Sequence, residues 1–282
     1  MTEEIAPGVY VSTAYPGINV GFIATDGGAV AVDAPPLPND ARAWKDHILE
    51  VADGPILYTI LTDHHLDRSL SAGLLDAPVV AGRGAFEGLR EGGAEEKLIN
   101  EWAKQHPEVA AELEDHHITL PDVTISDRVV IHGSPLVAVE RIAGSAPGSV
   151  WVLLREEGIL FAGDTLVVGT QPFLGDAPDT RAWLKTLVKM RRSYFPADTL
   201  IPGWGAVCDE DGTQPLSEYI RRVRRRIRSV HTAGGDRSEL AELVPEFLAM
   251  FPVEEGERER LQCRITAGLE QVYEELTPKD TA

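Results

Sequence analysis

The chain is poor in cysteine, aromatic residues and positive charge, and it contains no long hydrophobic run. Its only cysteines among 282 residues are Cys208 and Cys263, which lie in different segments without the spacing of a thiolate metal site. This excludes a disulfide framework, and we expect two reduced thiols. No apolar run could span a bilayer, and the N-terminus lacks the basic and apolar segments of a secretory signal. We therefore expect a cytoplasmic protein.

The charge balance disfavours nucleic acids and membrane surfaces as partners. The chain carries 26 Lys and Arg against 45 Asp and Glu, a net charge of −19, which repels phosphate backbones and anionic lipid heads. The exception is a run of six arginines within residues 221–228. Because no aromatic residues interleave it, we interpret the run as a helix face that pairs with acidic helices or with a second copy of the chain. We expect a small-molecule ligand or substrate, and a homo-oligomer is compatible with the run.

Hydrophobic patterning indicates an α/β chain with two strand-rich stretches. Between them, the pattern from about residue 85 to residue 117 is helical and charged, which predicts a helical insert. A further helix is expected near residues 180–195. Strands are expected at 18–25, 29–33, 56–61 and 79–81 in the first stretch, at 123–125, 129–131, 136–141, 150–154 and 159–162 in the second, where they should form a second sheet, and at 199–201.

The last part of the chain is entirely helical. After Pro215, apolar residues recur at helical spacing in three segments, around residues 220–230, 240–248 and 261–276. We therefore predict a main domain over residues 1–214, which contains the insert, and a C-terminal helical extension over residues 215–282.

The segment from Thr62 to Arg68 is the strongest candidate for a functional site. It reads Thr-Asp-His-His-Leu-Asp-Arg and places two carboxylates, two imidazoles and a guanidinium after a buried strand. Such a cluster is costly inside a core, whereas loops at strand ends let polar side chains converge while they keep part of their solvation. The segment is therefore a candidate site on its residues alone.

In this place the sequence resembles the metallo-β-lactamase superfamily, whose hallmark is Thr-His-x-His-x-Asp-His. Aligned on Thr62, the chain offers Asp63, His65, Asp67 and Arg68, so the first and last hallmark histidines are replaced. Four further landmarks follow the family's order. They are the hairpin of residues 19–23 and 30–33, the loop of residues 143–149 with Ser145 at a histidine position, the strand of residues 160–165 with the aspartate Asp164, and the loop of residues 201–205 with Trp204 at a histidine position.

The resemblance implies a four-layered αββα sandwich and a metal-dependent hydrolase site. The family normally binds two metal ions, and ligands carried over residue by residue leave Asp63, His65 and Asp164 for the first. The second position is expected to be empty, because arginine stays protonated and tryptophan has no lone pair to donate. Arg68 would occupy the vacated position and pair with Asp67 or Asp164, while His64 falls on a spacer position and is expected to point away.

The sequence is compatible with two classes of function. In the first, the chain is a hydrolase-like protein that holds at most one divalent metal, Zn, Mn or Fe, on Asp63, His65 and Asp164. Asp67 would orient or deprotonate water. The substrate would be an ester, thioester, lactam or phosphodiester.

In the second class, no metal binds and the protein is not a catalyst. The same side chains then form a polar network or a ligand pocket with Arg68 and Trp204, or the chain is an interaction protein that dimerises through its extension. Trp102 and Phe173 could line such a pocket, although core packing explains aromatic residues equally well.

Overall fold

The computed structural model describes residues 2–91, 99–100, 103–104, 107, 111, 113 and 116–277. Its first sheet has seven strands in chain order, β1 (Thr2–Ala6), β2 (Val9–Ser12), β3 (Val20–Thr25), β4 (Gly28–Val32), β5 (Ile56–Leu61), β6 (Val79–Gly82) and β7 (Val123–Ile125). The pairs from β1 to β4 are antiparallel, and those from β4 to β7 are parallel. Parallel neighbours place their carboxyl ends at the same edge of the sheet.

The second sheet has five strands in the order β12-β11-β10-β9-β8. Their bounds are β8 (Arg128–Ile131), β9 (Val137–Arg141), β10 (Val150–Leu154), β11 (Ile159–Val167) and β12 (Thr199–Trp204). The β11–β12 pair is parallel, and the other pairs are antiparallel. The two sheets stack on a core of branched aliphatic side chains from both, which include Ile23, Ile60, Val139 and Val152. This is the burial expected when sheets pack face to face.

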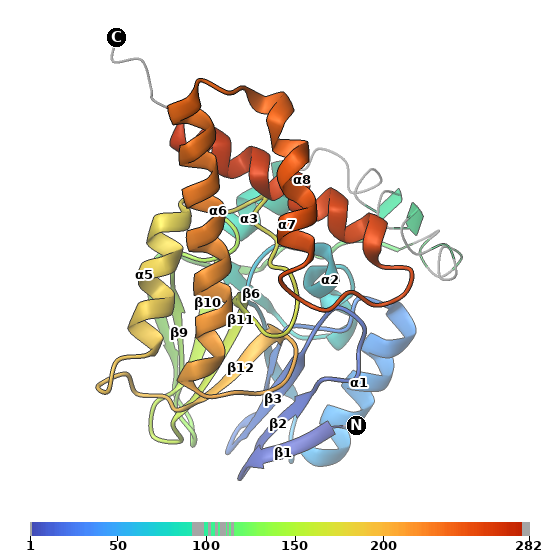
Figure 1. The fold of residues 1–282 in the computed structure, drawn as a ribbon. Coiled ribbons are helices and arrows are strands. Elements are labelled where there is room, and N and C mark those ends of the chain that lie inside the picture. Colours follow the sequence, from blue (N-terminus) through green and yellow to red (C-terminus); the bar gives the residue numbers. More distant parts are fainter. Residues whose placement is uncertain are drawn as a thin grey trace.

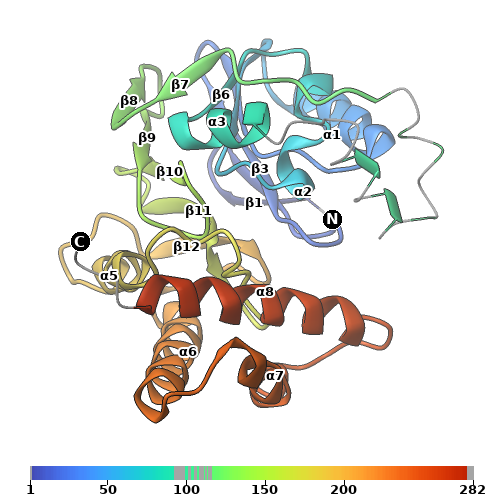
Figure 2. The ribbon, with the colours of Figure 1, turned by 90° about the horizontal axis from the view of Figure 1, so that it is seen from above.

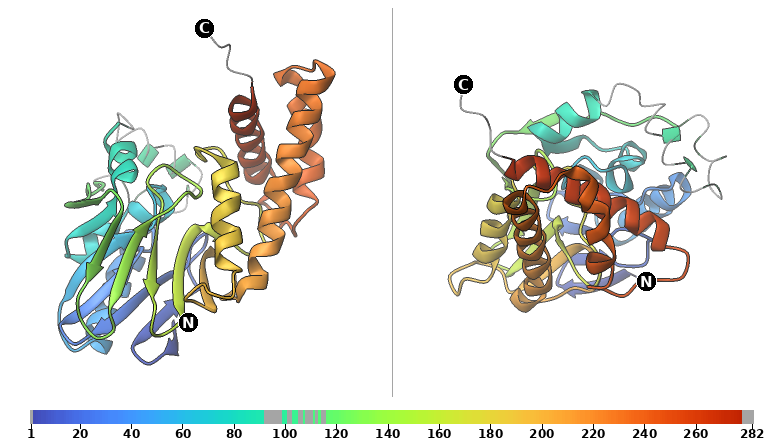
Figure 3. Two further views of the ribbon diagram at one scale, coloured as in Figure 1. Left: turned by 90° about the vertical axis from the view of Figure 1, so that its left-hand side faces the viewer. Right: turned by 45° about the horizontal axis from the view of Figure 1, so that its top comes forward.

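Helices cover both outer faces of the sheets. On the first sheet lie α1 (Pro38–Val51), α2 (Leu66–Ser69), α3 (Arg83–Glu91) and a 3₁₀ turn (Ala72–Leu75), and α1 buries Trp44 and Ile48. On the second lie α5 (Thr180–Met190) and α6 (Thr213–Ala233), as the left view of Figure 3 shows. The four-layered αββα sandwich expected from the resemblance is confirmed (Figure 1).

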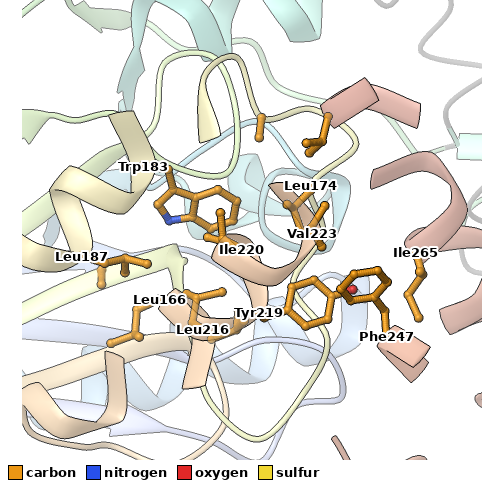
Figure 4. Packing of buried hydrophobic residues seen from close by; sticks show 14 of the residues in the cluster. Leu166, Leu174, Trp183, Leu187, Leu216, Tyr219, Ile220, Val223, Phe247 and Ile265 are labelled. Carbon is orange, nitrogen blue, oxygen red and sulfur yellow. The ribbon is translucent and has the colours of Figure 1, made fainter. Parts of the chain in front are cut away.

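The C-terminal extension packs on the second sheet. Besides α6, which a 3₁₀ turn (Glu210–Gly212) precedes, it contains a 3₁₀ segment (Arg237–Leu243), α7 (Val244–Leu248) and α8 (Arg258–Leu276). Leu166 of β11 and Trp183 of α5 share one buried cluster with Tyr219 of α6, Phe247 of α7 and Ile265 of α8 (Figure 4). The extension is therefore continuous with the core of the sandwich.

Three of the six arginines in the α6 run pair with neighbouring acidic residues. Arg222 and Arg226 pair with Glu246 at 2.6 and 3.0 Å, and the buried Arg224 contacts Glu275 of α8. These ion pairs fit the interpretation of the run as a face that pairs with acidic helices. Among the described residues, no helix combines the length and the apolar character that crossing a membrane requires.

The structure corrects two expectations about the strands and adds two strands that were not predicted. Residues 123–125 do form a strand, but β7 pairs with β6 and extends the first sheet, because a three-residue run carries no information about its partner. The strand expected to end at residue 162 continues to Val167, since the bulge at Gly163, with a φ of 53°, carries it onward. The polar edge strand β1 and the short β2 were missed.

The predicted helical insert is only partly described. Its first helix is α3, and the residues that follow include Ile99 and Leu113, which pack against Leu70. Most of the remaining residues between 92 and 115, including Trp102, lie outside the described part of the chain.

Candidate functional site

The candidate site forms where the carboxyl ends of β4 and β5 meet the middle of β11. Asp33 follows β4, Asp63 follows β5 and Asp164 lies within β11. The backbone N–H of Asp33 donates to the carbonyl of Ile60 at 2.8 Å, and that of Val150 donates to the carbonyl of Thr62 at 2.8 Å. Hydrogen bonds from both sheets therefore fix the segment that carries the polar residues.

Arg68 lies at the centre of the cluster and is fully buried. Its Nη2 is 2.7 Å from Asp164 Oδ1, its Nε is 2.9 Å from Asp63 Oδ1, and its Nη1 is 3.0 Å from Asp33 Oδ2. Asp67 is a more distant neighbour, at 3.7 Å from Nε. The pairing with Asp164 expected from the sequence is thus present, and two further aspartates share the guanidinium. The contact of Nη1 with Asp33 is a charge-assisted hydrogen bond, whereas those of Nε with Asp63 and of Nη2 with Asp164 are close ion pairs without hydrogen-bond geometry.

Asp33 anchors this arrangement from the opening hairpin. Its carboxylate accepts hydrogen bonds from the Thr62 backbone N–H at 2.8 Å and from the Thr62 hydroxyl at 2.7 Å, in addition to Arg68. Burial raises the pKa of Asp33 to about 6, although Arg68 and Thr62 oppose the shift. The φ of Asp33 is 56°, a left-handed value that aspartate tolerates in tight turns.

Asp63, His65 and Asp164 come together as the sequence suggested. Each offers one ligand atom, and these atoms all lie within 4.8 Å of one another. His65 Nδ1 is 3.0 Å from Asp63 Oδ1 and 3.7 Å from Asp164 Oδ2. Ligands at about 2.0–2.2 Å from a tetrahedral ion lie roughly 3.4 Å apart, so the spacing suits a small divalent cation after modest adjustment. The donor set of one imidazole and two carboxylates also fits such an ion.

The electrostatics of the cluster favour positive charge at its centre. Burial alone would raise the pKa of Asp63, but Arg68 and His65 hold it well below its usual range. Burial would lower the pKa of His65, yet Asp63, Asp176 and Asp164 together raise it well above the ordinary value. Burial outweighs the opposing effect of Arg68 and raises the pKa of Asp164. The carboxylates therefore attract a proton or another cation to the position of His65.

Ser145 and Trp204, at the two other replaced histidine positions, differ in their surroundings. The buried Ser145 hydroxyl donates to Asp63 Oδ2 at 3.2 Å, so the serine supports a ligand residue. Trp204 ends β12, is half-buried, and packs against the core beneath the second sheet and near Gly17. Neither side chain belongs to the cluster that could hold an ion.

His64 stacks on His65 with ring centroids 5.2 Å apart, and its Nε2 lies 3.7 Å from Asp176 Oδ2. Its ring also lies close to Gly88 of α3. Burial lowers the pKa of His64, and the neighbouring His65 adds to that shift. His64 thus faces Asp176 and α3, not the group formed by Asp63 and Asp164.

Three side chains from distant segments complete the site. Asp176, in the loop after β11, lies 3.4 Å from His65 Nε2. Phe173, from the same loop, packs edge-on against the His65 ring at 5.6 Å between centroids, and Arg264 of α8 lies over Phe173 at 5.4 Å. Phe173 is one of the aromatic residues considered from the sequence as a pocket lining, whereas Asp176 and Arg264 were missed. Neither stands in a motif, and only the folding of α8 onto the loop brings them near.

Gly203 allows the β12 end to approach Asp164. A Cβ at Gly203 would lie 2.2 Å from Asp164 Oδ1 and 2.6 Å from its backbone N, whereas one at Gly27 would meet only Leu57 Cδ1, at 3.6 Å. We expect Gly203→Ala to lower the free energy of unfolding by about 1–3 kcal/mol, because backbone and a paired carboxylate would have to move. Denaturant unfolding measures the loss, with Gly27→Ala as the control. Equal stability of the two variants would show that the approach of Gly203 imposes no constraint.

Comparison with known proteins places the chain in a family. The model of the metallo-β-lactamase superfamily matches residues 16–204. None of the curated proteins compared with the sequence matches it. The structure is similar to that of a metallo-β-lactamase family protein from Thermus thermophilus, with 20% identity, 96% of this chain and 95% of that chain covered, and a TM-score of 0.68.

Two other solved structures share the fold at similarly low sequence identity. A metallo-β-lactamase from Pontibacter korlensis is 17% identical, with 78% of this chain and 98% of that chain covered and a TM-score of 0.61. The inverting sec-alkylsulfatase Pisa1 from Pseudomonas sp. is 17% identical, and the match covers 98% of this chain but 50% of that protein, with a TM-score of 0.68. The order of the landmarks, the two stacked sheets and the family match agree: the chain belongs to the metallo-β-lactamase superfamily.

Proposed function

We propose that the chain is a hydrolase-like member of its superfamily whose site holds one divalent metal ion beside a buried arginine. The observation that carries this proposal is that Arg68 contacts only one of the two carboxylate oxygens of Asp63 and of Asp164. Arg68 contacts Oδ1 of both Asp63 and Asp164. Among the described residues, Oδ2 of Asp63 has the Ser145 hydroxyl at 3.2 Å, and Oδ2 of Asp164 has only His65, at 3.7 Å. Each carboxylate therefore has an oxygen free of the guanidinium.

The second family metal position does not fit an ion in this chain. Arg68 and Trp204 stand where two imidazole ligands would be needed, and neither can donate an electron pair to a metal. The guanidinium supplies a single fixed positive charge to Asp63 and Asp164, which partly replaces the charge of an ion. We derive no step through that position.

The residues around the first metal position have separate proposed roles. Asp63, His65 and Asp164 would hold the ion, Ser145 fixes the orientation of Asp63, and Arg68 fixes that of Asp164. A divalent ion supplies Lewis-acid polarisation of a substrate oxygen and lowers the pKa of water. Asp67, whose side chain is 29% exposed and whose Oδ1 has no hydrogen-bond partner among the described residues, would orient water and accept its proton.

The fold does not select a substrate, so we propose the chemistry only as a class. The named neighbours are β-lactamases and an alkylsulfatase, which act on different bonds. A first panel would contain nitrocefin, p-nitrophenyl acetate, a thioester, bis-p-nitrophenyl phosphate and a p-nitrophenyl sulfate.

Asp67→Asn tests the proposed roles on whichever substrate responds. We expect the turnover number to fall by about 10²–10⁴-fold, because the amide cannot accept the proton, while metal content is unchanged. Asp46→Asn, at an exposed position on α1, is the control and should keep full activity. Full activity of Asp67→Asn would remove Asp67 from the mechanism, and no turnover of any substrate by metal-loaded protein would favour a binding role.

Two observations favour that second candidate, a metal-free ligand-binding protein. Arg68 already supplies a positive charge to the cluster, and the neighbouring carboxylates raise the pKa of His65 well above its ordinary value. A cavity of about 430 Å³ also lies against the loop that carries Ser145, lined by Arg83, Arg141 and Asp179 among others. Neither Arg68 nor Trp204 lines it, so this cavity differs from the pocket proposed from the sequence.

A further inference from the structure

Helix α8 packs against the loop of residues 173–177, which borders the candidate site. A Cβ at Gly268 of α8 would lie 3.1 Å from Leu174 Cβ, and a Cβ at Gly175 would lie 3.4 Å from Ala267 Cβ. The side chain of Gln271 donates to the carbonyl of Ala177 at 3.0 Å. Figure 2 shows α8 crossing the extension beside α6 and α7. The loop of residues 173–177 is therefore fixed by the extension.

The same loop lies between α8 and His65, one of the proposed metal ligands. Phe173 packs on the His65 ring, and Asp176 Oδ2 lies 3.4 Å from His65 Nε2. The guanidinium of Arg264 also lies over the Phe173 ring, with its Cζ 5.4 Å from the ring centroid. An arginine on an aromatic ring keeps the edges of its fork available for hydrogen bonds.

Arg264 is half-buried and has no ion-pair or hydrogen-bond partner among the residues that the structure describes. This is unusual in a chain with 45 acidic residues, and the nearby Arg260 on the same helix pairs with Glu257. Burial lowers the pKa of Arg264, and the carboxylates of Asp164 and Asp67 oppose that shift, so the guanidinium is within electrostatic range of the cluster. It remains charged at neutral pH.

We infer that Arg264 binds an oxyanion group of the ligand, a carboxylate, sulfate or phosphate, at the mouth of the candidate site. The planar fork suits such groups, and partial burial strengthens charge-assisted hydrogen bonds. Arg68 cannot take this role, since it is enclosed by Asp33, Asp63 and Asp164. The inference rests on the proposed function in placing the ligand at this site, and it narrows the ligand to an anionic small molecule.

Calorimetric titration with sodium sulfate, phosphate and acetate at constant ionic strength tests the inference without turnover. We expect at least one of these oxyanions to bind wild-type protein, with or without Zn²⁺ or Mn²⁺. Its dissociation constant should rise about tenfold or more in Arg264→Gln and less in Arg264→Lys, which keeps the charge but loses the fork. Arg260→Gln, at the neighbouring position of α8, should stay within about twofold of wild type.

Unchanged affinity in folded Arg264→Gln, or no binding to wild type up to about 50 mM anion, would overturn the inference. If Arg264→Gln does not fold, equal affinity of Arg264→Lys and wild type for all three anions would overturn it, since lysine lacks the fork. The outcome is independent of the proposed hydrolysis. Oxyanions can bind at Arg264 in a protein that turns nothing over, and a metal-dependent hydrolase of neutral substrates would not respond to Arg264→Gln.

Discussion

Arg68→Met is expected to lower the free energy of unfolding by about 3–5 kcal/mol, the typical cost of removing one partner from a buried ion pair. The guanidinium is fully buried and lies within 3.0 Å of Asp33, Asp63 and Asp164. Methionine approximates its length but leaves three buried carboxylates without their shared cation. Unfolding in urea, followed by tryptophan fluorescence, measures the loss.

The loss should depend on pH. Without Arg68, the pKa of each buried carboxyl rises in the folded state, so the folded variant gains relative stability as these groups take up protons. We therefore expect the deficit to be larger at pH 7 than near pH 5, and it should shrink when Zn²⁺ or Mn²⁺ is added. Arg83→Met is the control, because Arg83 is 68% exposed and, among the described residues, pairs only with Glu87. Equal losses in the two variants would contradict the central position of Arg68.

Asp164→Ala is expected to weaken binding of Zn²⁺ or Mn²⁺ by at least about 100-fold. Asp164 is one of the three residues whose ligand atoms lie within 4.8 Å, and even outer residues of metal sites cost about 10–100-fold when removed. Titration against a competing chelator measures the affinity. Because Asp164 also pairs with Arg68, Asp164→Asn serves as a second variant that keeps the side-chain volume.

The control for this experiment is Asp46→Ala, at an exposed position of α1. It should bind metal as wild type does. Wild-type affinity in Asp164→Ala would show that the ion binds elsewhere or that the cluster is a metal-free network, which is the second candidate function.

The fold could be predicted from the sequence because five landmarks follow the order of the superfamily, and the centre of the site because its polar segment is a local pattern. The buried strand Ile56–Leu61 followed by polar residues can be read in one segment, and the arginine at position 68 cannot be a ligand whatever its surroundings. Because clustered aspartates require a cation, a pairing of Arg68 with Asp67 or Asp164 could be expected, and Asp164 is the closer of the two at 2.7 Å against 3.7 Å.

Other parts depend on contacts between distant segments, which no local pattern encodes. Strand β7 joins the first sheet by pairing with β6 after an intervening insert. Asp176 and Arg264 approach the site where α8 packs against the loop of residues 173–177, with Gly268 close to Leu174. The pattern after residue 215 predicted the two long helices α6 and α8, whereas the middle segment forms a 3₁₀ segment and the short α7. Helical spacing cannot say which side chain reaches a site in another part of the fold.

The metal content of the protein tests the central claim most directly. Untagged protein purified without chelator, and a sample loaded with Zn, Mn or Fe and then desalted, would be analysed by inductively coupled plasma mass spectrometry. We expect about one ion per chain after loading, because in the proposed function the Arg68 guanidinium, paired with Asp63 and Asp164, takes the place of the second ion. Two ions per chain would contradict the role of Arg68, and no ion after loading with any of the three metals would contradict the proposed site.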